Sequence, residues 1–191
     1  MLSNFSYGSP VLRAIVNRKD TTHFSSNPIS KGSIETLLDS GMRISSKSVN
    51  DLWSYVVIQD EFFIDYLRQC ASILEKMDCS YESSKKKTAL AKSKSIMNGS
   101  PSIIAVCANL SLPFSIDDCW LSVENLLLTG SALGFCVTMD GSLLKVFNLS
   151  SIKSKLSIPD ELTVLAAIYV GEPENSELPP VLRSPKIWKW I

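Results

Sequence analysis

Apolar residues recur with helical spacing in several segments of the chain, and these segments predict the helices. Residues 11–17 form a short apolar stretch that predicts the first helix. Ser30 has the side chain of an N-cap, and apolar residues follow it at every third or fourth position. Asp60 can cap a longer helix in the same way. The apolar positions of these two helices are Ile34, Leu37, Leu38 and Met42, then Phe63, Tyr66, Leu67, Cys70, Ile73, Leu74 and Met77.

Short runs that are apolar almost throughout predict the strands of one buried sheet. The runs are short enough to be strands, and polar or turn residues bound them. Helical segments lie between them, at residues 84–97 and 143–156. The four predicted strands are residues 54–59, 102–109, 135–139 and 162–171.

A long apolar segment before the third predicted strand predicts another helix, which differs from the others in having no polar face. Ser115 and Asp118 have the spacing of a capping box, which predicts its start. The helix runs to about Leu133, and Gly134 predicts its end. Apolar residues lie almost all round it. We therefore expect it to be buried on every side or to lie in a subunit interface.

The order of elements predicts a single domain over residues 1–191, an α+β or α/β sandwich with helices on both sides of one mixed sheet. A proline-rich tail, residues 172–191, follows the last strand. Pro179 and Pro180 make further strand pairing of this tail unfavourable. Its apolar residues cannot bury themselves against one another, so the tail needs another surface.

The charges and the hydropathy of the chain exclude several classes of partner. The 19 basic and 19 acidic residues balance, so no overall field attracts nucleic acid or anionic lipid. No segment approaches the roughly 20 apolar residues that span a bilayer, and the first residues lack a secretory pattern. We expect a cytoplasmic protein with no membrane or nucleic-acid partner. The lysines at 85, 86, 87, 92 and 94 are expected on a solvated helix face.

The cysteines and the single histidine do not predict a metal site. The five cysteines are widely spaced and form no C-x-x-C pair, and His23 is the only histidine. Cysteines within apolar runs are expected to be buried free thiols. The chain also has no G-x-G-x-x-G, Walker or G-x-S-x-G motif, which argues against a Rossmann-type nucleotide site and a serine hydrolase.

Three polar clusters are candidates for ligand binding. Arg18 and Lys19 can bind a phosphate, although cations are also favourable at a helix C-terminus. Residues 44–53 offer hydroxyls and an amide to a polar ring above Trp53, or form an ordinary loop. The glycine-containing end of the long apolar helix allows a ligand to approach the backbone.

Taken in order, these clusters resemble the nitroreductase family of FMN enzymes. RKDTTHF, followed by Asn27-Pro28-Ile29, is similar to the family's R-R-S-x-R-x-F…P-I opening, and ISSKSVNDLW resembles its P-S-S-x-N-x-Q-P-W segment. DDCWLSVENLLLTGSALGF is close to the family's helix with Asn-Leu and Ala-Leu-Gly. LSIPDELTVLAAIYVGEPE and RSPKIWKW resemble its closing strand, Gly-x-Pro turn and basic tail. The resemblance extends from about Val11 to the end.

The resemblance implies a three-layer α/β/α sandwich of α+β class with a mixed, mainly antiparallel sheet. It also implies a homodimer that binds FMN at its interface, with the tail at 172–191 packed on the partner subunit. NADH or NADPH would supply hydride, and nitroaromatics, quinones or similar compounds would accept the electrons. The flavin carries the redox chemistry, so no side chain is assigned as an acid or base.

The resemblance also assigns the site residues. Arg18, Lys19 and Asp20 would contact the FMN phosphate and ribityl chain, with Arg183 reaching the phosphate from the tail. The loop residues would come from the partner subunit, and the turn after the third strand would approach the flavin ring. The remaining positions so assigned are Thr22, Ser45, Ser46, Ser48, Asn50, Asp140 and Gly141.

The chain departs from the family pattern at several of these positions. Thr22 occupies the second basic position of the opening motif, and Ile44 replaces the loop proline. The loop is one residue longer, so Ser48 and Asn50 compete for the family's asparagine. Related readings are therefore reductive dehalogenation or flavin breakdown on the same scaffold, and a degenerate binding protein without redox activity.

Overall fold

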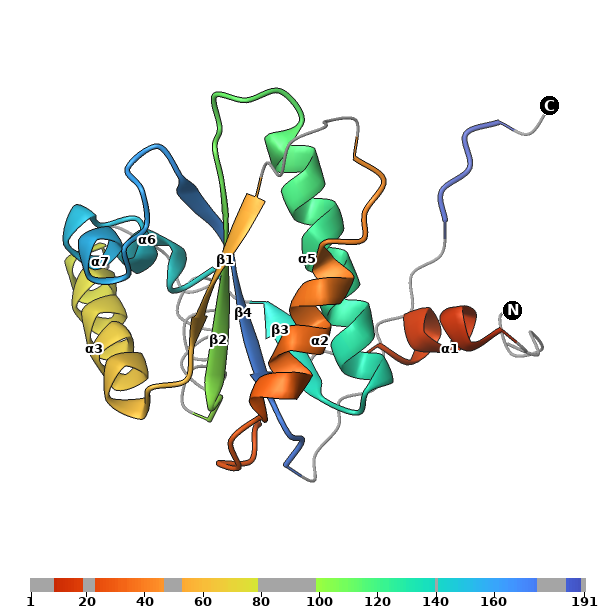
Figure 1. The fold of residues 1–191 in the computed structure, drawn as a ribbon, viewed down its shortest axis with the longest axis horizontal. Helices are drawn as coiled ribbons and strands as arrows, with labels where there is room; N and C mark the ends of the chain where they lie inside the picture. The colour runs from red at the N-terminus through yellow and green to blue at the C-terminus, as the bar shows by residue number, and fades with distance from the viewer. Residues whose placement is uncertain are drawn as a thin grey trace.

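The computed structural model describes residues 9–18, 23–46, 53–78, 99–139, 141–174 and 185–189. A four-stranded sheet forms its centre, in the order β1-β2-β4-β3 (Figure 1). Each neighbouring pair of these strands is antiparallel. This agrees with the mainly antiparallel sheet that we expected. The strands are β1 (Trp53–Ile58), β2 (Ser102–Ala108), β3 (Cys136–Met139) and β4 (Thr163–Gly171).

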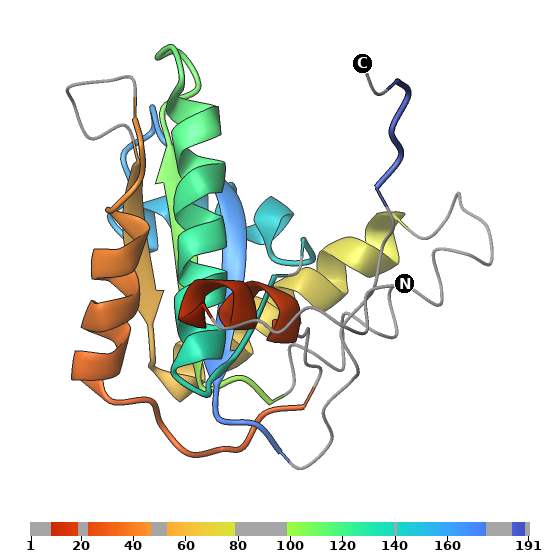
Figure 2. The same cartoon turned by 90° about the vertical axis from the view of Figure 1, so that its right-hand side faces the viewer.

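Helices cover both faces of the sheet, so the predicted three-layer α+β sandwich is confirmed (Figure 1). On one face lie α2 (Lys31–Gly41) and α5 (Ser115–Ala132), and α1 (Pro10–Asn17) packs against the outside of α5 (Figure 2). The other face carries α3 (Glu61–Asp78), α6 (Leu144–Phe147) and α7 (Ser150–Lys155).

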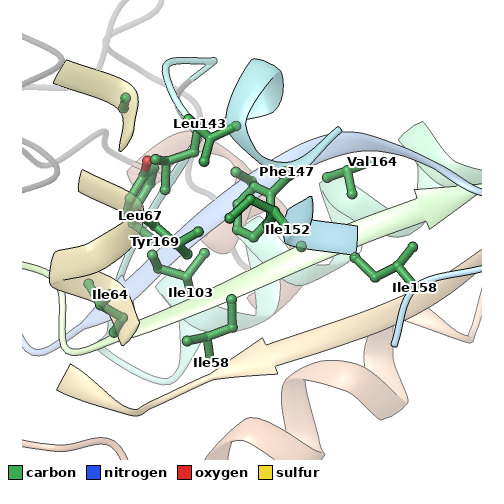
Figure 3. Packing of buried hydrophobic residues seen from close by; sticks show 14 of the residues in the cluster. Ile58, Ile64, Leu67, Ile103, Leu143, Phe147, Ile152, Ile158, Val164 and Tyr169 are labelled. Carbon is green, nitrogen blue, oxygen red and sulfur yellow. The ribbon is translucent and has the colours of Figure 1, made fainter. Parts of the chain in front are cut away.

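The central strands are buried on both faces, as their continuous apolar runs predicted. Every residue of β2 is buried, and its side chains alternate between two hydrophobic cores. Ile103 and Ala105 join the core beneath α3, α6 and α7, where Figure 3 shows Phe147 and Tyr169. Ile104 joins the core beneath α2 and α5.

A bulge in β4 changes the face to which its side chains point. The partner of Val106 is Ala166, whereas the partner of Cys107 is Val164, so Leu165 is an extra residue in the ladder. As a result Val164 lies in the α3-side core although Ala166 lies in the α2–α5 core.

Two of the three predicted helix starts are confirmed. The Ser30 side chain accepts a hydrogen bond from the backbone N–H of Ser33 at 3.1 Å, and the Asp60 carboxylate accepts one from Phe63 at 2.7 Å. The capping box at Ser115 and Asp118 was wrong. Phe114 is the N-cap, with φ of 66°, and Ser115 is already helical. The turns of residues 109–115 determine this start, and the Ser115 hydroxyl donates to a backbone carbonyl in them.

Of the two expectations for α5, burial on every side does not hold within the single chain. The face of α5 toward the sheet is buried, but Ile116, Trp120 and Leu121 remain 43–48% exposed on the other side. The alternative, a subunit interface, stays a prediction. The helix does end where expected, since Gly134 has φ of +82°.

The remaining elements agree closely with the sequence pattern. The four strands begin and end within one residue of their predicted bounds, and helical turns occupy residues 144–155. The predicted helix at residues 84–97 lies outside the described residues, as does most of the tail. Among the helices of the described part, none is long and apolar enough to cross a membrane.

Candidate functional site

Arg18 lies at the point where the chain leaves α1. Its backbone N–H donates to the Ala14 carbonyl at 3.1 Å, and its ψ of 127° ends the helix. The residue is half-buried. Arg18 therefore sits at a helix C-terminus, and both readings of the sequence remain compatible with this position. Lys19, Asp20 and Thr22 lie outside the described residues.

The start of the loop between α2 and β1 is attached to α5. We call residues 44–52 the 44–52 loop; only 44–46 are described, so Ser48 and Asn50 are outside the description. The Ser46 hydroxyl donates to the Asp118 carboxylate, which is only 3% exposed. Ser45 beside it is exposed. The two serines therefore have different surroundings, although the family resemblance gave both the same role.

Two more side chains of α5 hold the segments that flank this loop. The Asn125 amide donates to the carbonyls of Ser40 at 3.1 Å and Arg43 at 2.9 Å. After the loop, in β1, the hydroxyl of Tyr55 lies 2.6 Å from that of Ser122. Trp53 belongs to the same network.

The indole N–H of Trp53 donates to the Tyr55 hydroxyl at 2.9 Å. Burial raises the pKa of Tyr55, and the hydrogen bonds from Ser122 and Trp53 only partly offset that effect. Tyr55 therefore stays protonated at neutral pH and can donate to Ser122 while it accepts from Trp53.

Sequence reasoning missed Asp118 as a loop partner, and it gave no role to Ser122 or to Asn125, the asparagine of the quoted Asn-Leu pattern. Their spacing of four and three residues places them on one face of α5. A regular polar series within an otherwise apolar helix was the available signal. Its meaning depended on which element packs against that face.

Gly141 follows β3 and is exposed, with its carbonyl accepting from the Leu144 N–H at 3.1 Å. A Cβ built on Gly141 would meet only the Leu144 side chain, at 3.9 Å. Packing within the chain therefore does not require glycine here, and the backbone is open to a ligand. Asp140 and Arg183 lie outside the described residues.

The described candidates do not gather within one chain. Arg18 follows α1, which lies against the C-terminal half of α5 (Figures 1 and 2). Ser46 is bonded to Asp118 in the first turn of the same helix. Because α5 has 18 residues, it is about 27 Å long, so the two ends are far apart.

Exposed apolar side chains lie on the outer sides of α1 and α5. We call this the α1–α5 surface. Large contiguous apolar patches on a protein usually mark an interaction site. The exposed members of the α1–α5 surface are Val11, Leu12, Ile15, Ile116, Trp120 and Leu121.

Two of the four described cysteines have the buried surroundings that the sequence predicted, whereas Cys70 and Cys136 are only partly buried. Cys107 and Cys119 are buried free thiols. Burial raises the pKa of Cys107 to about 11 and that of Cys119 to about 12. Both therefore remain uncharged thiols at neutral pH and are poor nucleophiles. In the described part of the chain, no three His, Cys, Asp or Glu side chains gather where they could hold a metal ion.

A pocket of about 590 Å³ lies on the α3 side of the sheet. Ile64 and Arg68 of α3 line it, together with Gln59, Ser100 and Glu174. None of the candidate residues contributes to it. The pocket is therefore separate from the loop and helix ends described above.

Comparison with known proteins gives one family match. The model of the Nitroreductase family matches residues 15–172, a range that contains Arg18, Ser45, Ser46 and Gly141. A sequence search of curated proteins found no match.

Several solved structures have a similar fold. A nitroreductase with bound FMN from Desulfitobacterium hafniense DCB-2 gives a TM-score of 0.80 at 16% identity, over 92% of this chain and 95% of that one. An NADPH:FMN oxidoreductase from Vibrio harveyi, complexed with NAD+, gives 0.70 at 16% identity, over 95% and 78%. An iodotyrosine deiodinase bound to FMN and 3-iodo-L-tyrosine gives 0.76 at 19% identity, over 94% and 98%.

Proposed function

The chain belongs to the nitroreductase family, and on that basis we propose that it is an FMN-dependent oxidoreductase. It takes hydride from NADH or NADPH and passes the electrons to a nitroaromatic, a quinone or a similar acceptor. The observation that carries this proposal is the family match, which spans every described candidate residue from Arg18 to Gly141.

The chemistry of the described candidates fits a flavin mononucleotide. Arg18 offers a planar guanidinium, which suits a phosphate, and Ser45 offers an exposed hydroxyl. Gly141 leaves its backbone accessible, which suits the edge of a flat polar ring.

FMN, when bound, supplies the redox chemistry, and the protein binds and orients it. We assign Arg18 to the phosphate, together with Lys19, Asp20, Thr22 and Arg183 around the phosphate and ribityl chain. The residues assigned nearer the ring are Ser45, Ser48, Asn50, Asp140 and Gly141. The resemblance also places Ser46 in this group, but its hydroxyl donates to Asp118, so we assign it a supporting role. No side chain is assigned as a catalytic acid or base.

A homodimer would complete this site. Arg18 and Ser45 lie toward opposite ends of α5 within one chain, so one subunit does not bring them together. Pairing of two chains through the α1–α5 surface would bury its apolar side chains and place the 44–52 loop of one subunit near Arg18 of the other. This arrangement agrees with the exposed positions of Trp120 and Leu121.

The described part of the tail also favours a partner subunit. Trp188 is 99% exposed and Ile187 is 59% exposed within the single chain. This exposure supports docking of the tail on a partner subunit over the alternative, a tail folded back on its own domain. We assign the tail to the partner subunit, where it would bring Arg183 toward the phosphate.

The colour and flavin content of the purified protein test the proposal directly. We expect a yellow protein with about one FMN per chain that oxidises NADH or NADPH in the presence of an acceptor. Apoprotein that does not take up FMN, measured by flavin fluorescence, would instead support a degenerate binding protein.

Reductive dehalogenation is a second candidate activity, because the iodotyrosine deiodinase is similar over almost the whole chain. A panel of nitroaromatic, quinone and halogenated phenol acceptors, tested in single turnover against the reduced protein, separates the two activities. Loss of the flavin spectrum during turnover would indicate flavin breakdown.

A further inference from the structure

Three polar side chains form a series on the face of α5 that packs toward α2 and β1. We call Asp118, Ser122 and Asn125 the α5 polar series. Asp118 and Ser122 are almost fully buried, and Asn125 is half-buried. Their apolar neighbours Cys119 and Leu126 belong to the α2–α5 core. Buried polar groups in such a core are costly unless they are hydrogen-bonded.

Each member of the α5 polar series has a partner next to the 44–52 loop. Asn125 holds the Arg43 carbonyl before the loop, and Asp118 holds the Ser46 hydroxyl within it. Ser122 reaches Tyr55, just after the loop ends, and Tyr55 in turn accepts from Trp53. One helix face therefore fixes the chain on both sides of the loop.

Of these three contacts, we expect the one between Asp118 and Ser46 to have the largest effect on the position of the loop. Its carboxylate is 3% exposed, and among the described residues its side-chain partner is Ser46. A hydrogen bond to a charged group is roughly twice as strong as one between neutral groups. The position in the first turn of α5 also favours a negative charge. Ser46 is thus held firmly, while Ser45 beside it remains exposed.

We propose that Asp118 is a positioning residue for the cofactor-binding loop, acting through Ser46. Ser46 then serves as an anchor, and Ser45 is the serine that presents its hydroxyl to the polar part of the flavin. This inference rests on the proposed function for the identity of the ligand. The attachment of the loop to α5 rests on the contacts alone.

Four variants test the proposal: Asp118→Ala, Asp118→Asn, Ser46→Ala and Ser45→Ala. Asp117→Ala is the matched control, because Asp117 is an exposed acid in the same helical turn. Two quantities are measured. One is the FMN affinity of the apoprotein by fluorescence titration. The other is the amide hydrogen exchange of a peptide covering residues 43–53 in the flavin-free protein. Thermal unfolding checks that each variant is folded.

Loss of the anchor should change both quantities. We expect Asp118→Ala and Ser46→Ala to speed exchange in 43–53 and to weaken FMN binding roughly tenfold. The double variant should be no worse than either single one, because both remove the same interaction. Asp118→Asn keeps an acceptor oxygen but loses the charge, so it should weaken binding less than Asp118→Ala does. Ser45→Ala should weaken binding without faster exchange, and Asp117→Ala should change neither.

Two results would overturn the proposal. Unchanged exchange in Asp118→Ala would show that Asp118 does not hold the loop. Weaker FMN binding in Ser46→Ala with unchanged exchange would make Ser46 a direct ligand. If Asp118→Ala does not fold, Ser46→Ala decides, since it removes one oxygen only. Failure of the wild-type protein to bind FMN would refute the proposed function, and the exchange measurement would still judge the anchor.

Discussion

Gly41 shows how one residue without a side chain permits the contacts that support the loop. It is the last residue of α2, and a Cβ there would lie 2.4 Å from the Tyr55 hydroxyl and 3.0 Å from that of Ser122. A Cβ essentially never lies as close to another atom as it would to the Tyr55 hydroxyl, and the distance to Ser122 is tighter than in most real contacts. The close approach of Tyr55 to α2 and α5 therefore requires glycine.

Gly41→Ala should destabilise the protein by about 1–3 kcal/mol, because the added methyl group overpacks a buried contact. Urea denaturation measures the change. Gly32→Ala is the control: a Cβ at Gly32 meets nothing within 4 Å, and alanine there is expected to be neutral or to stabilise α2 by up to about 1 kcal/mol. Equal stability of the two variants would show that Tyr55 can move away at no cost.

Arg18→Ala should weaken FMN binding by about 10- to 150-fold, through loss of a charge-assisted contact worth roughly 1.5–3 kcal/mol. Titration of the apoprotein with FMN gives the affinity. Arg13→Ala is the matched control, because Arg13 is an exposed arginine on the same short helix. If Arg18→Ala binds FMN as tightly as the wild type, the phosphate site lies elsewhere.

At the scale of secondary-structure elements, α5 contributes to three parts of the molecule. Its inner face packs on the sheet, its polar series holds the segments around the 44–52 loop, and its outer face belongs to the α1–α5 surface. A shift of α5 would therefore disturb the core, the loop and the expected interface together.

Trp120→Glu should convert the proposed dimer to monomers, because it places a charge among apolar side chains that the proposed pairing would bury. Sedimentation velocity at micromolar concentration measures the oligomeric state. Ile73→Glu is the control, since Ile73 is an exposed apolar residue on α3, across the sheet. A dimeric Trp120→Glu protein would place the interface on another surface.

At the scale of the whole molecule, the site that we propose draws on more than one chain. The described candidates lie toward the two ends of α5, and residues 185–189 extend away from their own domain (Figure 1). In the proposed dimer each subunit would supply only part of the site, so we expect cofactor binding and dimer formation to be coupled.

Deletion of the residues after Asn175 should lower dimer stability and FMN affinity together. The tail carries apolar side chains such as Trp188, each of which buries roughly 150–250 Å² when docked. Sedimentation and FMN titration of the truncated protein test this coupling. A truncated protein that remains dimeric and keeps its flavin would show that the tail has no part in either.

Turnover should follow a ping-pong scheme, with the oxidised nicotinamide leaving before the acceptor enters. The chain has no separate Rossmann motif for a nicotinamide, so we expect one flavin face to serve both substrates. Initial rates at varied acceptor and several NADH or NADPH concentrations should give parallel double-reciprocal lines. Intersecting lines would indicate a ternary complex and a second substrate site.

Much of the fold could be predicted from the sequence because its determinants are local. The continuous apolar run at 102–108 predicted a buried strand, and the caps at Ser30 and Asp60 depend on residues three positions away. Hydrophobic periodicity and short-range hydrogen bonds need no knowledge of distant partners. The family resemblance added the candidate site residues, in the order in which they occur along the chain.

The tertiary structure decided everything that depends on residues far apart in the sequence. Ser46 and Asp118 are 72 positions apart, and no local pattern predicts that this acid binds the loop rather than capping its own helix. The strand order, the bulge at Leu165 and the outward face of Trp120 likewise follow from how α2, α5 and the sheet pack. Packing gives a side chain its partner, so the roles of Asp118, Ser122 and Asn125 emerged only in the folded chain.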